Sequence, residues 1–363
     1  MNVIKTLHRA IGAGLASIVL LISVTGVMLV WKKEYLWVSI PSARELPAQN
    51  VGYADLIETI LSGYHANEVL FVRFYLDELS LHKVWLSGGR YAFHDQLGKQ
   101  IQVWEANERF EDWLLDLHHR LLAGNTIGLN VVGLSGLLLL PLMIFGLILW
   151  WSWRRSYSFN LFPASSRLGQ IRKSHAETGV TTLLPVLLVV ISGVILVYPS
   201  ESRFIFRDGF KEAEPPKVSI IEAHKIPSSV SWMSVFALLD GEFPEAKIRW
   251  LALPDEKSGA FSIGVQETAS WDRMGRSQIK FTGEEWLKIE QRKQPSIFRL
   301  FDFFYPLHTG KLPVWYRFLL STAGIMLAWI CFLGLLTLFK RRAAKEVAAK
   351  ANPRETTSRK TKQ

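Results

Sequence analysis

The chain has 363 residues and a single cysteine, Cys331. One cysteine excludes an intrachain disulfide, a CxxC redox pair and the CxxCH motif that attaches haem covalently. A Gly-rich βαβ unit is missing as well, which argues against a bound dinucleotide. Charged residues are absent from four apolar runs, residues 10–31, 121–153, 178–200 and 318–339. Each run is longer than the about 20 residues that cross a bilayer, so a wholly soluble protein is excluded.

Positive charge is concentrated in short, alternate segments. The whole chain has 42 Lys and Arg residues against 32 Asp and Glu residues, a net charge of +10. Residues 1–9, 154–177 and 340–363 hold 16 of the basic residues and 3 of the acidic ones, a net charge of +13. Because short basic loops stay in the cytoplasm, we expect both termini inside and the two long loops outside. The charge therefore indicates membrane topology rather than nucleic-acid binding.

The expected fold is an α-helical membrane protein with a four-transmembrane-helix bundle and two small α+β extracytoplasmic modules. The first run exceeds the roughly 7–15 apolar residues of a signal peptide and lacks a small-x-small cleavage site, so we expect a retained anchor. The expected order is a cytoplasmic N-terminus (1–9), a first transmembrane helix (10–31), a first module (32–120), a second helix (121–153), a cytoplasmic loop (154–177), a third helix (178–200), a second module (201–317), a fourth helix (318–339) and a basic cytoplasmic tail (340–363).

Matched spacings indicate that this arrangement is a duplication. His8 and His175 are each followed by a glycine four residues later and by a second glycine, Gly26 or Gly193, 18 residues later. Eighteen residues make five helical turns, so the histidine and the distant glycine share one helix face. The second and fourth runs match through Gly136 with Gly146 and Gly324 with Gly334, each pair ten residues apart.

The two long loops also correspond in their expected elements. Each has a helical stretch, a strand-like stretch and an Asp-x-x-Gly turn that leads into another short strand. These are residues 55–61, 72–76 and 95–99 in the first loop, and residues 233–239, 248–253 and 272–276 in the second. Each loop therefore predicts a helix on a short antiparallel sheet. An even number of crossings separates the halves, which predicts an axis along the membrane normal between them.

Five histidines stand at the ends of the apolar runs. His8 and His175 precede the first and third runs on the inner side, His118 and His119 precede the second on the outer side, and His308 precedes the fourth. The duplication predicts that His8 faces His175 and that His118 faces His308. Two neutral imidazoles from facing helices can hold a planar haem in a bundle core, and the matched glycines would let it lie against the helices. We therefore expect two b-type haems near opposite edges of the hydrocarbon layer.

Other interpretations of these residues carry less weight. A lone histidine at a helix end is more often an interfacial residue, and a membrane glycine is more often a helix-packing point. Recurrence at four symmetry-related edges favours cofactor ligands instead. A histidine pair lacks the third ligand that zinc needs. The apolar runs hold no ionisable side chain except Cys331, whereas a permease needs polar groups at mid-depth.

The motifs around these histidines resemble the PepSY-associated transmembrane family of bacterial inner-membrane proteins, and the resemblance spans residues 1–342. It is carried by Leu7-His8-Arg9, by Leu117-His118 with Leu-Leu-x-Gly ending at Gly124, by Ser174-His175 with Gly179, and by Pro306-Leu307-His308-Thr309-Gly310-Lys311. The outer loops resemble PepSY domains. Two departures are Ala176 after His175, where arginine is common, and His119, where the family often has arginine. His118 and His119 thus both stay open as ligands, with His118 favoured by the spacing to Gly124.

The resemblance implies an enzyme similar to haem-containing ferric-siderophore reductases, located in the bacterial inner membrane. It implies that His8 and His175 are the axial iron ligands of an inner haem and that His118 and His308 are those of an outer haem. Electrons would pass from the cytoplasm to an iron chelate in the periplasm. Reduction to the ferrous state would weaken the bonds of iron to the hard oxygen ligands of the chelator and release the metal. Without a nucleotide-binding unit in the chain, a cytoplasmic flavoprotein or reduced flavin is the expected donor.

Residues near these motifs have weaker expected roles. Arg9, Arg120 and Lys311 adjoin ligand histidines and are candidates to pair with haem propionates, or are ordinary interfacial cations. His65, His82, His94 and His224 are candidates to contact substrate, although surface or turn positions are favoured for them. The cluster at residues 301–305 is expected to be an interfacial aromatic belt. The alternative function is a non-enzymatic anchor whose PepSY-like modules bind or inhibit a periplasmic partner.

Overall fold

The computed structural model describes residues 2–45, 51–74, 79–207, 217–221, 231–254, 261–267, 277–281, 286–290 and 296–351. The chain forms two compact units. Unit 1 comprises Met1–Val30, Leu114–Arg203 and Phe304–Gln363, and unit 2 comprises Trp31–Trp113 and Phe204–Phe303. The expected turn at residues 272–276 and His224 lie outside the described residues.

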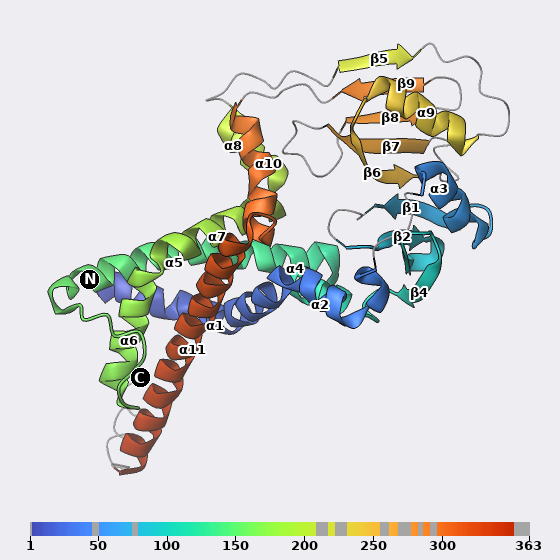
Figure 1. The fold of residues 1–363 in the computed structure, drawn as a ribbon. Helices are drawn as coiled ribbons and strands as arrows, with labels where there is room; N and C mark the ends of the chain where they lie inside the picture. Colours follow the sequence, from blue (N-terminus) through green and yellow to red (C-terminus); the bar gives the residue numbers. More distant parts are fainter. Residues whose placement is uncertain are drawn as a thin grey trace. The chain divides into compact units, whose positions relative to one another are not determined.

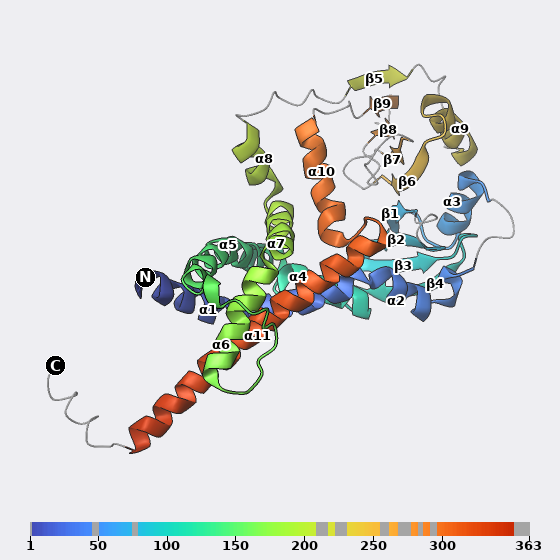
Figure 2. The ribbon, with the colours of Figure 1, turned by 60° about the vertical axis from the view of Figure 1, so that its left-hand side comes forward.

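Unit 1 contains the apolar helices. Three helical segments of the described chain are long and apolar enough to cross a membrane, and they are Asn2–Val30, Gly124–Trp151 and Val314–Val347. They correspond to α1 (Asn2–Val30), the turn η3 (Gly124–Gly128) with α5 (Leu129–Trp151), and α11 (Val314–Ala351). A fourth candidate is the pair α6 (Leu168–Thr181) and α7 (Leu183–Val197), which meet at an angle of 68° (Figure 2). The described chain thus has three spanning helices, or four if the bent pair is one span.

A proline explains the break between α6 and α7. Pro185 has no backbone N–H, and its ring clashes with the carbonyl four residues earlier, that of Thr181, if the helix continues. The α-helix accordingly ends at Thr181, and Thr182 lies outside the helical region with φ −100° and ψ 9°. The apolar run 178–200 therefore covers the end of α6, all of α7 and the first two residues of α8 (Pro199–Arg207), because a run without charges does not reveal a kink.

The apolar helices of unit 1 pack around a core of aliphatic side chains. Helix α1 contacts α11 and α5, and α7 contacts α5 and α11 (Figure 1). A Cβ at Gly324 of α11 would lie 2.5 Å from Val27 of α1, and one at Gly136 of α5 would lie 2.8 Å from Val194 of α7. These two close crossings are related by the duplication. The core between them is Leu15, Val19, Leu139, Val186, Val190, Ala323, Leu327 and Cys331.

The remaining elements of unit 1 are short helices at the ends of the apolar ones. They are α4 (Phe110–Arg120), η4 (Arg154–Ser156), α8 (Pro199–Arg207) and α10 (Ser296–Thr309), of which α4, α8 and α10 begin or end in unit 2. Helix α4 ends in a turn at which Leu121, Leu122 and Gly124 have φ of 51°, 58° and 74°. A Cβ at Gly128 would lie 1.7 Å from the carbonyl oxygen of Arg120, so only glycine fits there. The Leu-Leu-x-Gly motif therefore forms a left-handed turn rather than a helix start.

Unit 2 is a single antiparallel sheet with helices. The strand order is β4-β3-β2-β1-β6-β7-β8-β9-β5. The strands are β1 (Val69–Arg73), β2 (His82–Leu86), β3 (Arg90–His94), β4 (Gln100–Glu105), β5 (Lys217–Ile221), β6 (Lys247–Ala252), β7 (Phe261–Gln266), β8 (Ser277–Phe281) and β9 (Trp286–Glu290). The short helices of this unit are α2 (Lys32–Ser39), η1 (Pro41–Ala43), α3 (Tyr53–Ser62), η2 (Ser87–Gly89) and α9 (Trp232–Glu242).

The two long loops share this sheet instead of forming separate modules. Strands β1 and β6 pair antiparallel, with Arg73 opposite Trp250, and the amide of Phe74 donates to the carbonyl of Arg249 at 3.0 Å. Arg73 and Arg249 are equivalent in the duplication, so the pairing is centred on a local two-fold axis. Helices α3 and α9 contact each other and pack on one core with Ile57, Leu239 and the central strands (Figure 1). Each loop alone would expose an edge strand, and the pairing of β1 with β6 covers both edges.

Candidate functional site

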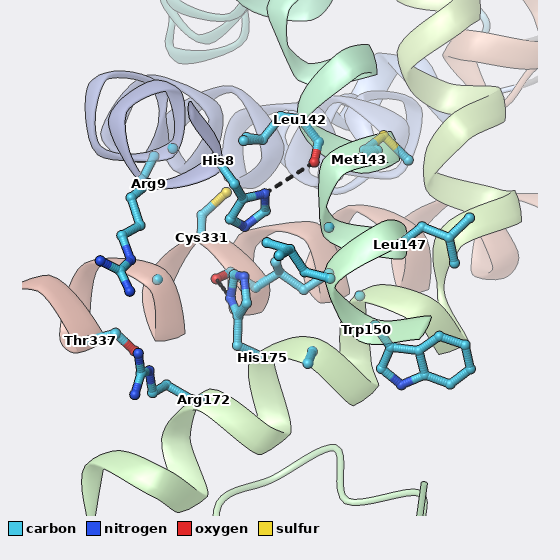
Figure 3. Close-up of a pocket in the computed structure, with 18 of the residues that line it drawn as sticks. His8, Arg9, Leu142, Met143, Leu147, Trp150, Arg172, His175, Cys331 and Thr337 are labelled. Carbon is cyan, nitrogen blue, oxygen red and sulfur yellow. Dashed lines mark hydrogen bonds between the residues drawn. The ribbon is translucent and has the colours of Figure 1, made fainter. Parts of the chain in front are cut away.

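Two histidines from different helices face each other at one end of unit 1. His8 lies on α1 and His175 on α6, and their ring centroids are 6.2 Å apart. Both line a cavity of about 420 Å³ whose walls come from α1, α5, α6, α7 and α11. Figure 3 shows the two imidazoles pointing toward one another, with Cys331 and Leu142 beside them. The structure therefore brings together the inner pair that the duplication predicts.

A second pair is formed by His118 and His308. His118 lies in the last turn of α4 and His308 in the last turn of α10, and their ring centroids are 6.3 Å apart. His119 lies beside them, with its ring centroid 5.6 Å from that of His118. The ring planes of His118 and His308 are tilted by 41°, and this ring contact makes His118 the favoured partner of His308.

All four histidines are held by the same hydrogen bond. Each Nδ1 donates to the carbonyl oxygen of a residue in a neighbouring apolar helix, at 3.0–3.2 Å. The four pairs are His8 with Leu142, His118 with Ile22, His175 with Ile330, and His308 with Val189. In every case the acceptor precedes one of the matched glycines by four residues. The histidine is thus bound to one turn of a helix whose next turn carries a glycine.

The matched glycines make room for the imidazoles themselves. A Cβ at Gly26 would lie 2.9 Å from Cε1 of His118, and one at Gly193 would lie 3.0 Å from Cε1 of His308. The inner pair has looser contacts, 3.3 Å from Gly146 to His8 and 3.6 Å from Gly334 to His175. The sequence predicts these glycines, but it assigns them to contact with a macrocycle, whereas the structure places the histidine rings against them.

Two hydroxyl groups reinforce the outer pair, and the sequence analysis missed both. Thr25 Oγ1 lies 3.1 Å from Nδ1 of His118, and Ser192 Oγ lies 3.1 Å from Nδ1 of His308. Each hydroxyl residue directly precedes the matched glycine of its helix, as Thr25-Gly26 and Ser192-Gly193. The repeated pair of a hydroxyl residue and a glycine is a signal that was available in the sequence.

These hydrogen bonds determine which ring nitrogen is free. A carbonyl oxygen only accepts, so each Nδ1 carries the proton and each Nε2 keeps its lone pair. Within the described part of the chain, no protein group is bonded to Nε2 of any of the four histidines. A histidine whose Nδ1–H is bound to a backbone carbonyl is the usual form of a metal ligand. Each ring therefore has its Nε2 lone pair available, as a metal-binding histidine requires.

The two pairs lie at opposite ends of α1. His8 belongs to the inner pair and Gly26, which contacts His118, lies 18 residues further along the same helix. At a rise of 1.5 Å per residue the pairs are about 27 Å apart along the helix. The hydrocarbon core of a bilayer is about 30 Å thick.

The three cations that adjoin the ligand histidines have different surroundings. Arg9 lines the inner cavity. Arg120 is bonded to Asp116 at 2.8 Å, one turn earlier in α4. The Lys311 ammonium lies 5.2 Å from the ring centroid of Tyr305, which belongs to the aromatic cluster at residues 301–305 of α10. Only Arg9 of the three is thus shown beside a cavity.

The histidines of unit 2 are mostly interior residues. His82 and His94 face each other on β2 and β3 and are 0% and 1% exposed. Burial, with a smaller contribution from the charge of His94, lowers the pKa of His82 to about 3. Both nitrogens of His94 are engaged, by the Tyr64 hydroxyl at 2.7 Å and the Gly98 carbonyl at 2.8 Å. Of the described outer histidines, only His65 is exposed, in a turn.

A buried ionic cluster braces the β2 to β4 end of the sheet. The Lys83 ammonium lies 3.1 Å from Oδ1 of Asp112, and Trp104 Nε1 donates to Oδ2 of Asp112 at 2.7 Å. Burial opposes ionisation of Asp112, but the charges of Lys83 and Lys32 outweigh it and lower the pKa. The cluster is structural, because it lies within the packed interface of the sheet with α2 and η1.

Several apolar helices of membrane-spanning length define an α-helical membrane protein. The described residues contain no group of three or more His, Cys, Asp or Glu that could hold a metal ion. The chain belongs to the family of the PepSY-associated TM region, whose model matches residues 5–341. No curated protein matches the chain.

Proposed function

We propose that the chain is an inner-membrane di-haem b oxidoreductase with its termini in the cytoplasm. In this proposal His8 and His175 hold an inner haem, and His118 and His308 hold an outer one. The oxidoreductase passes electrons from a cytoplasmic donor, a flavoprotein or reduced flavin, to an acceptor in the periplasm. The acceptor is a ferric siderophore or another ferric chelate.

One observation carries the proposal, the separation of the rings in the two pairs. A metal–imidazole bond measures about 2.0–2.1 Å and the ring nitrogen lies about 1.2 Å from the centroid, so two imidazoles on opposite sides of one metal have centroids about 6.4 Å apart. The separations of 6.2 Å and 6.3 Å agree with that value. Aromatic rings packed directly on each other have centroids about 4.5–7 Å apart, so the separation supports ligation in combination with the Nδ1 hydrogen bonds that leave each Nε2 free. The donor set fits a haem and is too small for zinc.

The residues of the chain prepare these sites for ligation. The carbonyl oxygens of Leu142, Ile22, Ile330 and Val189 hold the Nδ1 protons, which fixes each ring and raises the basicity of Nε2. A haem bound between two such rings supplies a one-electron carrier that changes oxidation state without moving a proton or ligand. The side chains between the pairs are apolar and offer a charge-carrying solute no polar groups at mid-depth.

The direction of transfer rests on the charge distribution of the sequence. The basic segments assign His8 and His175 to the cytoplasmic edge and the sheet unit to the periplasm. The two PepSY-like loops, joined through β1 and β6, would then bind the acceptor in the periplasm. Reduction of ferric iron weakens its bonds to hard oxygen ligands, which gives the transfer a use in iron release.

The test is the visible spectrum and haem content of the full-length protein purified in detergent. We expect a Soret band, dithionite difference bands of six-coordinate b-type haem and two haems per chain. His8→Ala and His308→Ala should each remove about one haem, while His65→Ala, in an exposed turn of unit 2, should keep both. A colourless protein that also fails to bind added haemin, or four histidine variants that keep the wild-type spectrum, would refute the proposal.

The acceptor is tested separately in proteoliposomes. A dithionite-reduced protein should be reoxidised by an external ferric chelate, with the ferrous product trapped by a coloured ferrous-specific chelator. If the reduced spectrum persists in the presence of several ferric hydroxamates and catecholates, the chain carries electrons to another acceptor.

A further inference from the structure

Three arginines gather at one side of the cavity that contains His8 and His175. Arg9 comes from α1, Arg172 from α6 and Arg341 from α11, and all three line the cavity. Arg341 lies close enough to Arg172 and Arg9 to be repelled by both. Figure 3 shows Arg9 and Arg172 on one side of the histidine pair and Trp150 on the other.

The cluster has no anionic partner within the described residues. None of the three guanidinium groups forms an ion pair there, although ion pairs are present elsewhere in the same unit. The nearest buried carboxylate in sequence, Glu177, is occupied by Lys173 at 3.8 Å and by the amide of Ser158 at 3.2 Å. Like charges held together without a counter-ion repel each other, and such a group favours binding of an anion.

The duplication does not account for the cluster. The equivalent of Arg172 in the first half is Lys5, which keeps the charge, but the equivalent of Arg9 in the second half is Ala176. Seven residues after the matched glycines stand Trp153 in the first half and Arg341 in the second, and both line the cavity. The lining of the cavity is thus asymmetric, because the equivalents of Arg9 and Arg341 are Ala176 and Trp153.

We infer that Arg9, Arg172 and Arg341 form a carboxylate-binding site that takes the two propionates of the haem between His8 and His175. The arginines would thereby determine which edge of the haem faces them, since Trp150 lies on the other side of the histidine pair. This inference rests on the proposed function. Arginine suits the task because its planar fork donates two parallel hydrogen bonds to a carboxylate.

The test compares haemin with haemin dimethyl ester, in which both propionates are esterified. Haem-depleted full-length protein is titrated with each compound, in the wild type and in an Arg172→Gln/Arg341→Gln double variant, and binding is followed by the Soret absorption and its circular dichroism. Every protein in this comparison also carries His308→Ala, which removes the proposed outer site so that only the inner site is titrated. Arg154→Gln is the matched control, since Arg154 follows α5, does not line the cavity and binds the Trp151 carbonyl.

We expect the wild type and Arg154→Gln to prefer haemin over its ester by about 10-fold to 100-fold, because hydrogen bonds between charged groups are about twice as strong as neutral ones. In the double variant the preference should fall to less than about 3-fold, and the sign or size of the Soret dichroism should change as the orientation is released.

Three results would overturn the inference. One is equal affinity of the wild type for haemin and its ester. Another is a double variant whose preference matches that of the wild type. The third result comes from titrations in nanodiscs with and without phosphatidylglycerol. If the arginines bind lipid phosphate instead, the double variant would keep its preference for haemin and lose only the effect of the anionic lipid. Failure of the wild type to bind either compound would instead refute the proposed function.

Discussion

Under the proposed function, replacing Gly26 by alanine should weaken haem binding by the outer pair, because the new methyl group would collide with the His118 ring. Its carbon would lie 2.9 Å from Cε1 of His118. Carbon atoms in contact are normally about 3.5–4.0 Å apart, so the ring must move by about 0.6 Å or more. The ring has little freedom to move, since its Nδ1 is held 3.0 Å from the Ile22 carbonyl and 3.1 Å from the Thr25 hydroxyl.

The size of the effect follows from the cost of overpacking. Such insertions cost about 1–3 kcal/mol, which corresponds to a roughly 5-fold to 150-fold weaker site if the whole cost falls on the bound geometry. The four glycines form a graded series, with distances of 2.9 Å at Gly26, 3.0 Å at Gly193, 3.3 Å at Gly146 and 3.6 Å at Gly334. Alanine at Gly334 is therefore expected to have the smallest effect, because 3.6 Å is ordinary contact.

The assay is haemin titration of each variant together with the haem content of the purified protein. The matched control is Gly14→Ala, where a Cβ would meet nothing within 4 Å. Alanine is about 1 kcal/mol better than glycine in a helix interior, so this control should gain thermal stability and keep both haems. If Gly26→Ala binds two haems with wild-type affinity, or if Gly14→Ala loses haem equally, the packing of imidazole against glycine does not control ligation.

Three further predictions concern single side chains. Thr25→Val keeps the shape of the residue but removes the hydroxyl beside Nδ1 of His118, and a lost hydrogen bond of about 1 kcal/mol should weaken outer haem binding about 5-fold in the same titration. Burial lowers the pKa of His82 to about 3, so between pH 6.5 and 3 the unfolded chain binds a proton that the folded chain does not. The free energy of unfolding should therefore fall as the pH drops through this range, by at most about 1.4 kcal/mol per pH unit. His82→Leu should flatten that slope in urea titrations of the full chain. Asp112→Ala leaves the Lys83 ammonium buried without its anion and should cost about 3 kcal/mol in the same urea titrations, whereas adding Lys83→Met should restore part of the loss.

The sequence was informative about the fold wherever a pattern repeats over many residues. Most of each charge-free run lies in one helix, α1, α5, α7 or α11, and the helical stretches of the two loops lie in α3 and α9. It was less informative where a single residue interrupts a pattern. Pro185 breaks the third run, and the left-handed turn at Leu121 and Leu122 removes the start of the second from the helix. Both features depend on backbone conformation, which hydropathy does not encode.

The pairing between the two loops could not have been predicted from their patterns. The strands at residues 69–73 and 247–252 read as ordinary half-buried strands, and nothing in either specifies a partner 170 residues or more away. The duplication alone suggested two modules related by an axis. That the axis passes through a β1 to β6 ladder depends on both edge strands being free to pair, which is a property of the folded loops.

The site was predicted at the level of residues but not of contacts. Spacing identified the two histidine pairs and the four glycines, because both are fixed by helix geometry. The carbonyl acceptors four residues before each glycine have no side-chain signature, so the sequence could not indicate them. The cations Arg172 and Arg341 were overlooked since each lies in a segment where basic residues also serve topology.

The contacts give a physical reason for the duplication itself. Each half contains both a histidine and its brace: His8 is held by α5 of its own half, and His118 by α1. The second half repeats this pattern. His175 is hydrogen-bonded to α11, and His308 is hydrogen-bonded to α7. Yet neither half contains a pair, because every pair joins one histidine from each half. If the proposed haems bind, each site therefore requires both halves, because each half supplies one histidine to each pair. A mutation in one brace should then affect one ligand of one site, and a mutation that separates the halves should abolish both.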